Sequence, residues 1–430
     1  MIDKLLSNLR GEYEKVADNR GSNSRYELLD NLSCGLAIFH LKDASLLAFR
    51  EQLPHRTENL KQIYGLEATV NIPSDNALRD CLDQVVPESL QESFNSLLKI
   101  AAEEGLLESK KVLKNKGGYL CISADGTGFF SSNAISCSEC MIKNRKNGKT
   151  EYYHQMLVAA IVSPYQKSVF PVWGEAIVKQ DGSKKNDCEQ NASKRLLPII
   201  RAQLPNEKIL MLLDGLYPNA PVIRSLEQER MSYIITIKEG YVLEQIKRLD
   251  VCGGLKKQVL EKGKTTGLIE YAEKLIINGQ NQDLIVNYFR YTEVDAKSKK
   301  VVYSNEWVTD IDFQDIDFQE LVDIARARWK IENETFNTLK NQNYNLEHSY
   351  GHGKKHLSTV FALLMLTAFF IDQIALTADE TYIRARKKYK TYRAFLQRIR
   401  TVFDFLPAIS MNALLRFIAG DIQINLPKIE

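Results

Sequence analysis

The chain has 430 residues, of which 44% are hydrophobic and 26% are charged, and these proportions exclude collagenous, low-complexity and wholly disordered proteins. Lys and Arg (57) exceed Asp and Glu (54) by three, so total charge does not indicate a polyanionic partner, and any nucleic-acid surface must arise from local clustering. At roughly 100 to 200 residues per domain, the length predicts two or three domains.

Residues 1–115 contain amphipathic, helix-favouring runs that are separated by turn residues. Ser74 has the side chain of a helix N-cap and precedes one of these runs. We therefore predict an all-helical N-terminal domain over residues 1–115.

Residues 116–239 begin with three β-rich runs and then alternate between helical and strand patterns. The predicted elements are strands at 119–125, 152–164 and 168–173, a helix at 188–203, a strand at 209–213, a helix at 220–229 and a strand at 233–238. Successive strands favour an antiparallel meander, whereas strands separated by helices favour parallel pairing. The predicted fold class is an α/β core with a mixed sheet in the order β-β-β-α-β-α-β, followed by a further helix.

The rest of the chain is predicted to form a β-rich insertion at 240–316, a long helix within 317–356 and a helical region at 357–430. The insertion has no strong helical pattern between its strand-like runs. These runs cover residues 267–277, 283–292 and 300–307.

The most membrane-like stretch is Leu357–Leu376, but Asp372 and Gln373 interrupt its apolar pattern. We predict a helix buried inside the protein and no membrane association. The seven cysteines are an odd number, and the first residues have no apolar signal core, so we expect a reducing, cytoplasmic environment.

Two aspartates follow apolar strand patterns. Asp125 precedes Gly126-Thr127-Gly128, and Asp214 follows the run ILMLL. Carboxylates at the ends of neighbouring strands face the crevice where α/β sheets bind ligands, and they repel each other unless a cation lies between them. Hard oxygen ligands suit Mg²⁺ or Mn²⁺. The alternative is that each Asp only caps the following turn or helix.

A third candidate carboxylate lies on the predicted helix ELVDIARARWKIENETFNTLKNQ. The apolar stripe of this helix passes through Arg328 and Glu332, which predicts that both face the core. Ionised groups are costly there unless they meet a metal or a phosphate. Glu334 lies about 200° around the helix from Glu332 and remains a rival for the catalytic role. The alternative is a simple Arg–Glu pair four residues apart on a partly exposed face.

Together these segments resemble the DDE transposases of cut-and-paste bacterial insertion sequences. The matching segments are DGTG, LLDGLYPN, IITIKEG and RWKIENETFNTLKNQNYNLEH, with LSCGLAIFHLKDASLLAF and NIPSDNALRD near the N-terminus. The resemblance covers most of the chain and implies a ribonuclease H-like core with a β insertion before the catalytic Glu helix. It also implies that Asp125, Asp214 and Glu332 are catalytic and hold two Mg²⁺ or Mn²⁺ ions for attack on a DNA phosphodiester.

The same resemblance implies double-stranded DNA as the partner, because transposon ends and target must both be bound. It further implies a homodimer in the DNA complex, a DNA-binding role for residues 1–115, and action on the nucleoid in the bacterial cytoplasm.

The family's helix signature is Tyr, then Arg three residues on, Glu four further on and Lys seven after that. Arg328 and Glu332 match this signature, whereas Ala325 replaces the Tyr and Lys340 lies eight residues after Glu332. Arg328 is expected to hold a phosphate through its planar fork, with Lys340 and Lys238 as further phosphate-binding candidates.

The pair Cys137-x-x-Cys140 opens a basic, hairpin-like insert that ends at His154. Two thiolates and one imidazole suit zinc, and Cys121 or Cys188 is a conceivable fourth ligand. The alternative is a pair of ordinary reduced cysteines in a turn.

His348 and His352 follow the Glu helix with the four-residue spacing of one helical face. Gly351 and Gly353 argue against a continuous helix there, so we interpret both histidines as loop residues near phosphate.

Basic residues gather in three groups, at 110–116, 143–149 and 381–400. The DNA-binding candidates of the third group are Arg384, Lys387 and Lys388. Such groups neutralise DNA phosphates, although a solvated helix face is the usual explanation for a single run.

Two other functions fit the same residues. One is a metal-dependent DNA nuclease that cleaves strands but does not join them, and the other is a non-catalytic DNA-binding protein with the same fold.

Overall fold

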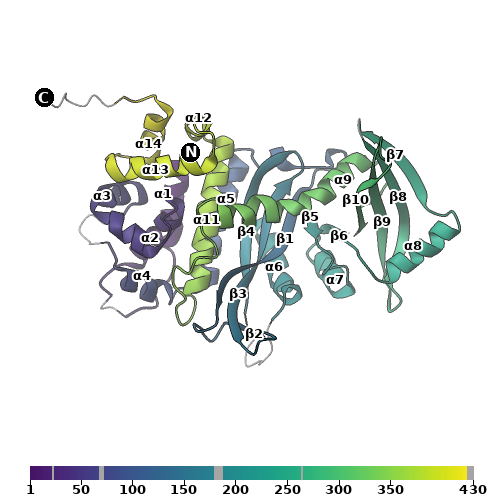
Figure 1. Ribbon diagram of the computed structural model, residues 1–430, viewed down its shortest axis with the longest axis horizontal. Coiled ribbons are helices and arrows are strands. Elements are labelled where there is room, and N and C mark those ends of the chain that lie inside the picture. The colour runs from purple at the N-terminus through teal and green to yellow at the C-terminus, as the bar shows by residue number, and fades with distance from the viewer. Residues whose placement is uncertain (22–23, 67–71, 179–186, 263–264, 424–430) are drawn as a thin grey trace.

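A helical lobe and a sheet-based lobe make up the computed structural model, which describes residues 1–21, 24–66, 72–178, 187–262 and 265–423 (Figure 1). The helical lobe combines both ends of the chain. Its helices are α1 (Ile2–Tyr13), α2 (Leu28–His40), α3 (Leu46–Tyr64), α4 (Asp75–Leu82), α5 (Gln91–Glu103), α11 (Leu357–Ala378), α12 (Glu380–Lys387), α13 (Tyr392–Phe405) and α14 (Met411–Ala419). The predicted N-cap is confirmed, since the Ser74 hydroxyl accepts from the Ala77 N–H at the start of α4 (3.4 Å).

Helix α11 forms the centre of the helical lobe and contacts both α2 and the strand β4 of the other lobe. Among the described residues it is the one helix that is long and apolar enough to cross a membrane, and 94% of its most apolar window is buried in protein. The prediction of a buried helix is therefore confirmed. Its carboxylate, Asp372, accepts hydrogen bonds from Lys42, Tyr344 and Tyr382.

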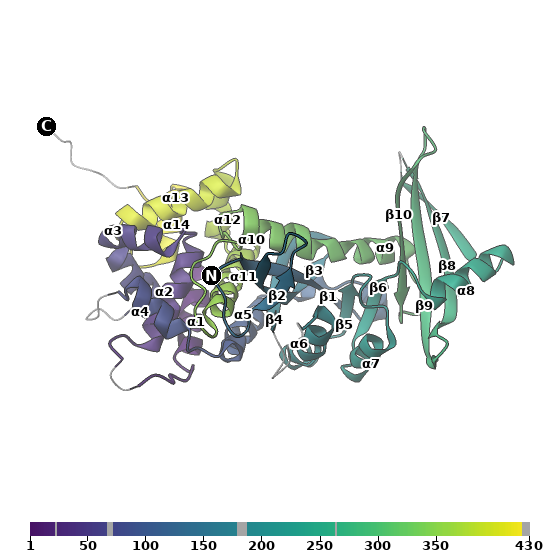
Figure 2. The same cartoon turned by 60° about the horizontal axis from the view of Figure 1, so that its bottom comes forward.

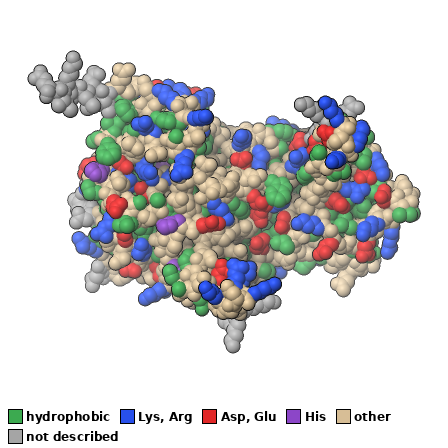
Figure 3. All heavy atoms as spheres, viewed as in Figure 1, with side chains coloured by type: hydrophobic (Ala, Val, Ile, Leu, Met, Phe, Trp, Pro, Cys, Tyr) green, Lys and Arg blue, Asp and Glu red, His purple; other side chains and the backbone are tan. Residues whose placement is uncertain are grey.

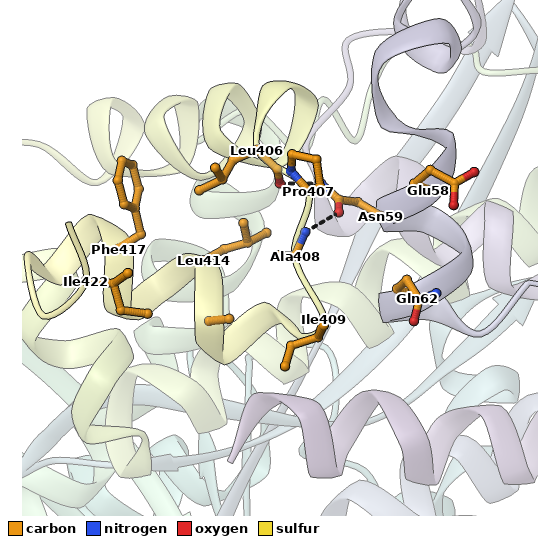
Figure 4. A pocket seen from close by; sticks show the side chains of 11 residues that line it. Glu58, Asn59, Gln62, Leu406, Pro407, Ala408, Ile409, Leu414, Phe417 and Ile422 are labelled. Atoms are coloured by element: carbon orange, nitrogen blue, oxygen red, sulfur yellow. Dashed lines mark hydrogen bonds between the residues drawn. The ribbon is translucent and has the colours of Figure 1, made fainter. Parts of the chain in front are cut away.

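Asn59 of α3 binds the end of α13 and the loop between α13 and α14 (Figure 4). Its amide nitrogen donates to the carbonyls of Phe403 (2.6 Å) and Leu406 (2.8 Å), and its amide oxygen accepts from the N–H of Ala408 (2.9 Å). An apolar hollow of about 560 Å³ lies beside Asn59, away from the strands of the sheet.

A ten-stranded mixed sheet runs through the second lobe in the order β2-β3-β1-β5-β6-β10-β9-β8-β7. Strand β4 pairs with β3 on the same edge as β2, opposite β1. The first part of the lobe consists of β1 (Leu120–Ser132), β2 (Met141–Asn144), β3 (Thr150–Ser163), β4 (Gln166–Ile177), α6 (Glu189–Gln203), β5 (Ile209–Leu213), α7 (Ala220–Gln228) and β6 (Ser232–Thr236). Strands β1, β3 and β4 are antiparallel, whereas β1, β5 and β6 are parallel. The order follows the predicted one, with the short strand β2 added.

The insertion extends this sheet. It contains α8 (Tyr241–Val251), β7 (Lys256–Lys262), β8 (Thr265–Asn278), β9 (Asn281–Asp295) and β10 (Val301–Thr309). The three predicted strands lie in β8, β9 and β10, but α8 and β7 were not predicted. Strand β10 pairs with β6 of the core through Trp307 and Thr236, so the backbone hydrogen bonds continue from the core into the insertion.

The predicted long helix changes pitch along its length. It runs through α9 (Phe318–Arg326), a 3₁₀ turn (Ala327–Trp329), a π-helical turn (Ile331–Phe336) and α10 (Asn337–Asn341). Its apolar side packs on the sheet, and Figure 2 shows α6 and α7 on the opposite face. The Ser123 hydroxyl of β1 donates to the backbone carbonyl of Arg328 (3.0 Å) and so links the helix to the sheet.

Candidate active site

Two of the predicted carboxylates lie on adjacent parallel strands. Strand β1 pairs with β5 in a register that places Ser123 opposite Leu212, so two residues further along each strand come Asp125 and Asp214. Asp214 directly follows β5, and its Oδ1 also accepts from the Leu216 N–H (2.9 Å), as the capping alternative predicts. Asp125, expected at the end of a strand, instead lies within β1, because β1 continues in its pairing with β3.

Arg328 joins the third carboxylate to the first. One of its terminal nitrogens lies 3.3 Å from Asp125 Oδ2 and the other lies 3.1 Å from Glu332 Oε1. The Arg328–Glu332 pair is the one predicted by the alternative of a simple ion pair four residues apart. Arg328 also contacts Asp125, which is 203 positions earlier in the chain. Glu334 has a different neighbour, since its charge acts on Lys330.

The electrostatics of Asp125 reflect this crowding. Burial, and after it the hydrogen bond with Glu332, raise the pKa of the Asp125 carboxyl, the Arg328 charge opposes them, and the net result is a pKa of about 7. A carboxyl group with such a pKa is close to half-protonated at neutral pH. Arg328 contacts two of the three predicted carboxylates at this site.

Glu189 is a fourth carboxylate of this site that sequence reasoning missed. It begins α6, and a Cβ added to Gly126 would lie 2.2 Å from Glu189 Oε1. Burial raises the pKa of Glu189, and the nearby Asp214 charge adds to the rise. An acidic residue in the first turn of the helix after the meander was the available signal. Figure 3 shows acidic side chains gathered near the middle of this face, over the sheet.

The predicted basic residues divide into two sets. Lys238 lies beside the site, because a Cβ added to Gly215 would lie 3.3 Å from its Cδ atom. Lys340 pairs with Glu347 (2.7 Å) on the segment after α10. Three others lie in the helical lobe and are exposed: Arg384 and Lys387 of α12, and Lys388 at its C-cap. Arg384 is paired with Asp421.

The basic group at 110–116 is largely used inside the protein. Lys110 is buried and donates to both oxygens of Ser168, and Lys111 is paired with Glu108 and Glu207. Its expected contribution to a free DNA surface was therefore overestimated. The group at 143–149 is exposed on the β2–β3 hairpin.

The Cys137-x-x-Cys140 pair lies in a cluster of four side chains rather than three. The thiols and the imidazole of His154 are joined by His352, and all four ligand atoms lie within 4.8 Å of one another. His352 is in a loop, as expected, but it faces this cluster rather than a phosphate site. Cys121 and Cys188, the fourth ligands that we considered, lie in β1 and at the start of α6.

Comparison with known proteins identifies the family. Residues 137–370 match the sequence model of the transposase DDE domain. The matched segment contains Asp214, Arg328 and Glu332, and it begins shortly after Asp125. No curated protein matches the chain. Because the matched segment is more than half of the 430 residues, the protein belongs to the transposase DDE domain family.

Proposed function

We propose that this transposase binds the ends of an insertion sequence, cleaves them, and joins the freed 3′ ends to target DNA, with Asp125, Asp214 and Glu332 as the catalytic residues. The observation that carries the proposal is that Asp125 lies on the strand beside the one that Asp214 follows, and that Arg328 joins Asp125 to Glu332 of the π-helical turn. The proposed fold of this core is ribonuclease H-like, with residues 240–316 as its insertion.

The donor set suits two Mg²⁺ or Mn²⁺ ions. Carboxylate oxygens are the ligands that these hard cations prefer. Burial is the main cause of the raised pKa of Asp125, and a cation bound there would favour its ionised form. Asp125, Asp214 and Glu332 would hold the ions, with Glu189 as a further ligand or as an acceptor for their waters. Bound ions of this kind supply Lewis acidity to a phosphodiester and lower the pKa of an attacking hydroxyl.

Arg328 has two roles in this proposal. Its guanidinium lies 3.3 Å from the Asp125 carboxylate and 3.1 Å from the Glu332 carboxylate and neutralises both. Cations between the carboxylates would replace that neutralisation, and the planar guanidinium would then bind a DNA phosphate through two parallel hydrogen bonds.

The π-helical turn supports Lys340 as the counterpart of the family's Lys. A π turn adds one residue to the helical repeat, so an eight-residue spacing across it corresponds to a seven-residue spacing on a regular α-helix. Lys340 would exchange its partner Glu347 for a phosphate, and Lys238 would contact DNA from the side of Asp214.

Binding of double-stranded DNA is proposed to extend beyond the catalytic site. Arg384 and Lys387 of α12 and Lys388 at its C-cap would contact terminal DNA. Residues 1–115 would contribute to the same helical DNA-binding surface. Two ends must be handled together, so we propose a homodimer in the DNA complex, acting on the nucleoid in the bacterial cytoplasm.

The test is a strand-cleavage and strand-transfer assay on DNA carrying the inverted repeats that flank this reading frame. With Mg²⁺ or Mn²⁺ the protein should cleave the ends and form a covalently joined product. Asp125→Asn, Asp214→Asn and Glu332→Gln should each reduce cleavage by at least about 10³-fold while binding of terminal DNA persists.

Asp80→Asn is the matched control, because Asp80 is exposed on α4. Cleavage without any joined product would favour the nuclease alternative. Binding with no cleavage by the intact protein in either metal would favour the non-catalytic alternative.

A further inference from the structure

We propose that Cys137, Cys140, His154 and His352 form a structural zinc site that fastens the β2–β3 hairpin to the segment before α11. The site is separate from the carboxylates, and the inference does not depend on the proposed function. It rests on the distances among the four ligand atoms, on their surroundings, and on the elements that they connect.

The ligand atoms have the separations of a tetrahedral zinc site. The two sulfurs are 3.8 Å apart, and His154 Nε2 lies 3.4 Å from each of them. His352 Nε2 lies 3.2 Å from Cys140 Sγ and 3.1 Å from His154 Nε2. Zn–S bonds of about 2.3 Å and Zn–N bonds of about 2.0–2.1 Å at tetrahedral angles give about 3.8 Å for S···S, 3.5 Å for S···N and 3.3 Å for N···N.

Hydrogen bonds orient two of the ligands toward the cluster. The Nδ1 atom of His352 lies 3.1 Å from the carbonyl oxygen of Gly353, so Nδ1–H donates and Nε2 presents its lone pair to the cluster. The backbone N–H of Cys137 points at Cys140 Sγ (3.4 Å), an arrangement that stabilises a thiolate. Cys140, His154 and His352 are buried.

Aromatic rings pack against the two imidazoles. The His154 ring stacks on Phe129 at a centroid distance of 5.8 Å, and the His352 ring lies 4.3 Å from Phe130. Four protein ligands in an enclosed, apolar setting leave no open position for water or substrate, which is typical of a structural rather than a catalytic zinc.

The four ligands come from segments that are distant in the sequence. Cys137 and Cys140 precede β2, His154 is on β3, and His352 is 198 residues after His154, in the loop that leads into α11. An ion here would join the basic hairpin to the connection between the lobes. A second contact spans the same junction, since His356 Nδ1 lies 3.1 Å from Glu139 Oε1.

Metal analysis of the full-length protein, purified without chelator, tests the assignment. We expect one zinc per chain in the wild type and in two controls that replace exposed side chains outside the cluster, Cys252→Ser and His348→Ala. Cys140→Ser and His352→Phe should lose the zinc, whereas His352→Cys, which keeps four ligands, should retain it.

Cobalt substitution provides a second readout that does not rely on the variants folding well. Wild-type protein stripped of metal and titrated with Co²⁺ should develop the intense visible bands of tetrahedral cobalt and a thiolate charge-transfer band, saturating at one equivalent. Zn²⁺ should then displace the cobalt. Removal of metal should also lower the thermal midpoint, and Zn²⁺ should restore it.

Retention of zinc by Cys140→Ser, purification with iron in place of zinc, or absence of the cobalt bands from fully reduced wild-type protein would each overturn the proposal. The four groups would then be hydrogen-bonded thiols and imidazoles. Asp125→Asn should leave the zinc content unchanged, which separates this site from the carboxylates.

Discussion

Gly126 is the residue on which the packing of the carboxylates depends most directly. Its hydrogen occupies the space next to Glu189, and a Cβ there would lie 2.2 Å from Oε1 and 2.6 Å from Cδ of that side chain. An added methyl group therefore has to displace Glu189, whose flexible end can move without unfolding β1. Catalytic sites are sensitive to shifts of this size.

We expect Gly126→Ala to reduce metal-dependent DNA cleavage about 10- to 100-fold with little change in the thermal midpoint. Gly128→Ala is the control, because a Cβ at Gly128 meets its nearest atom only at 3.9 Å. Equal cleavage by the two variants would show that Glu189 does not need its present position.

The raised pKa of Asp125 predicts a pH dependence of stability. Its folded pKa of about 7 lies above its ordinary value of 3.8, so between these values the folded protein holds a proton that the unfolded chain releases. The stability of the metal-free protein should therefore fall as pH rises from 5 to 8, by about 2 kcal/mol from this group after allowance for its solvent contact.

Chemical denaturation in the presence of chelator, at pH 5 and at pH 8, measures this change. Asp125→Asn should remove its share of the pH dependence, and Mg²⁺ should stabilise the wild type at pH 8 but not at pH 5. If the stability of the wild type and that of Asp125→Asn depend equally on pH, the raised pKa of Asp125 is contradicted.

At the scale of single elements, α11 shows what a sequence pattern reveals and what it omits. The apolar run predicts a buried helix, and that prediction is confirmed. The start of the helix has no local capping side chain. Asp83, at the end of α4, accepts instead from the N–H groups of four residues at 2.9–3.1 Å: Lys354, Lys355, His356 and Leu357.

Asp83→Ala should lower the free energy of unfolding by about 2–3 kcal/mol, because it leaves several N–H groups at the start of α11 without their acceptor. Burial alone would raise the pKa of Asp83, but the four backbone hydrogen bonds lower it overall. The stabilisation should accordingly be lost as pH falls below about 4. Asp80→Ala on the same helix should change stability by less than about 0.5 kcal/mol, and an equal loss in both variants would contradict this role.

The pitch change around Glu332 is a second feature that the helical pattern alone does not predict. Residues 318–341 have the periodicity of one amphipathic helix, and the buried residues Leu321, Ile324 and Leu339 follow it. The π-helical turn is set by packing on β1 and β4, elements from distant parts of the sequence. The one sequence feature that reflects the π-helical turn is the eight-residue spacing between Glu332 and Lys340.

At the scale of the whole molecule, local sequence patterns predicted the order of elements in the core. They predicted the contacts between distant residues less well. Strand and helix periodicities gave the meander and the two crossovers that bring Asp125 and Asp214 together. Glu189 was not predicted as a site residue, and His352 was expected near a phosphate rather than in the Cys137 cluster. Their neighbours in space are 63 and 198 residues away (189 − 126 = 63). The helical lobe was expected as two separate regions for the same reason.

A buried ion pair joins the two ends of the chain within that lobe. Lys42 and Asp372 are 330 residues apart, both are nearly inaccessible, and Lys42 donates to Asp372 beside Tyr344 and Tyr382. Removing one partner of such a pair leaves an uncompensated buried charge, which costs more than removing both.

Lys42→Met should therefore destabilise the protein by about 3–5 kcal/mol, whereas Lys42→Met combined with Asp372→Asn should destabilise it by less than the sum of the single changes. Lys99→Met, at an exposed position on α5, is the control for loss of a lysine and should be nearly neutral. Chemical denaturation followed by circular dichroism measures all four variants. If the double variant is as unstable as the sum of the single variants, Lys42 and Asp372 act independently and the energetic coupling proposed for this ion pair is absent.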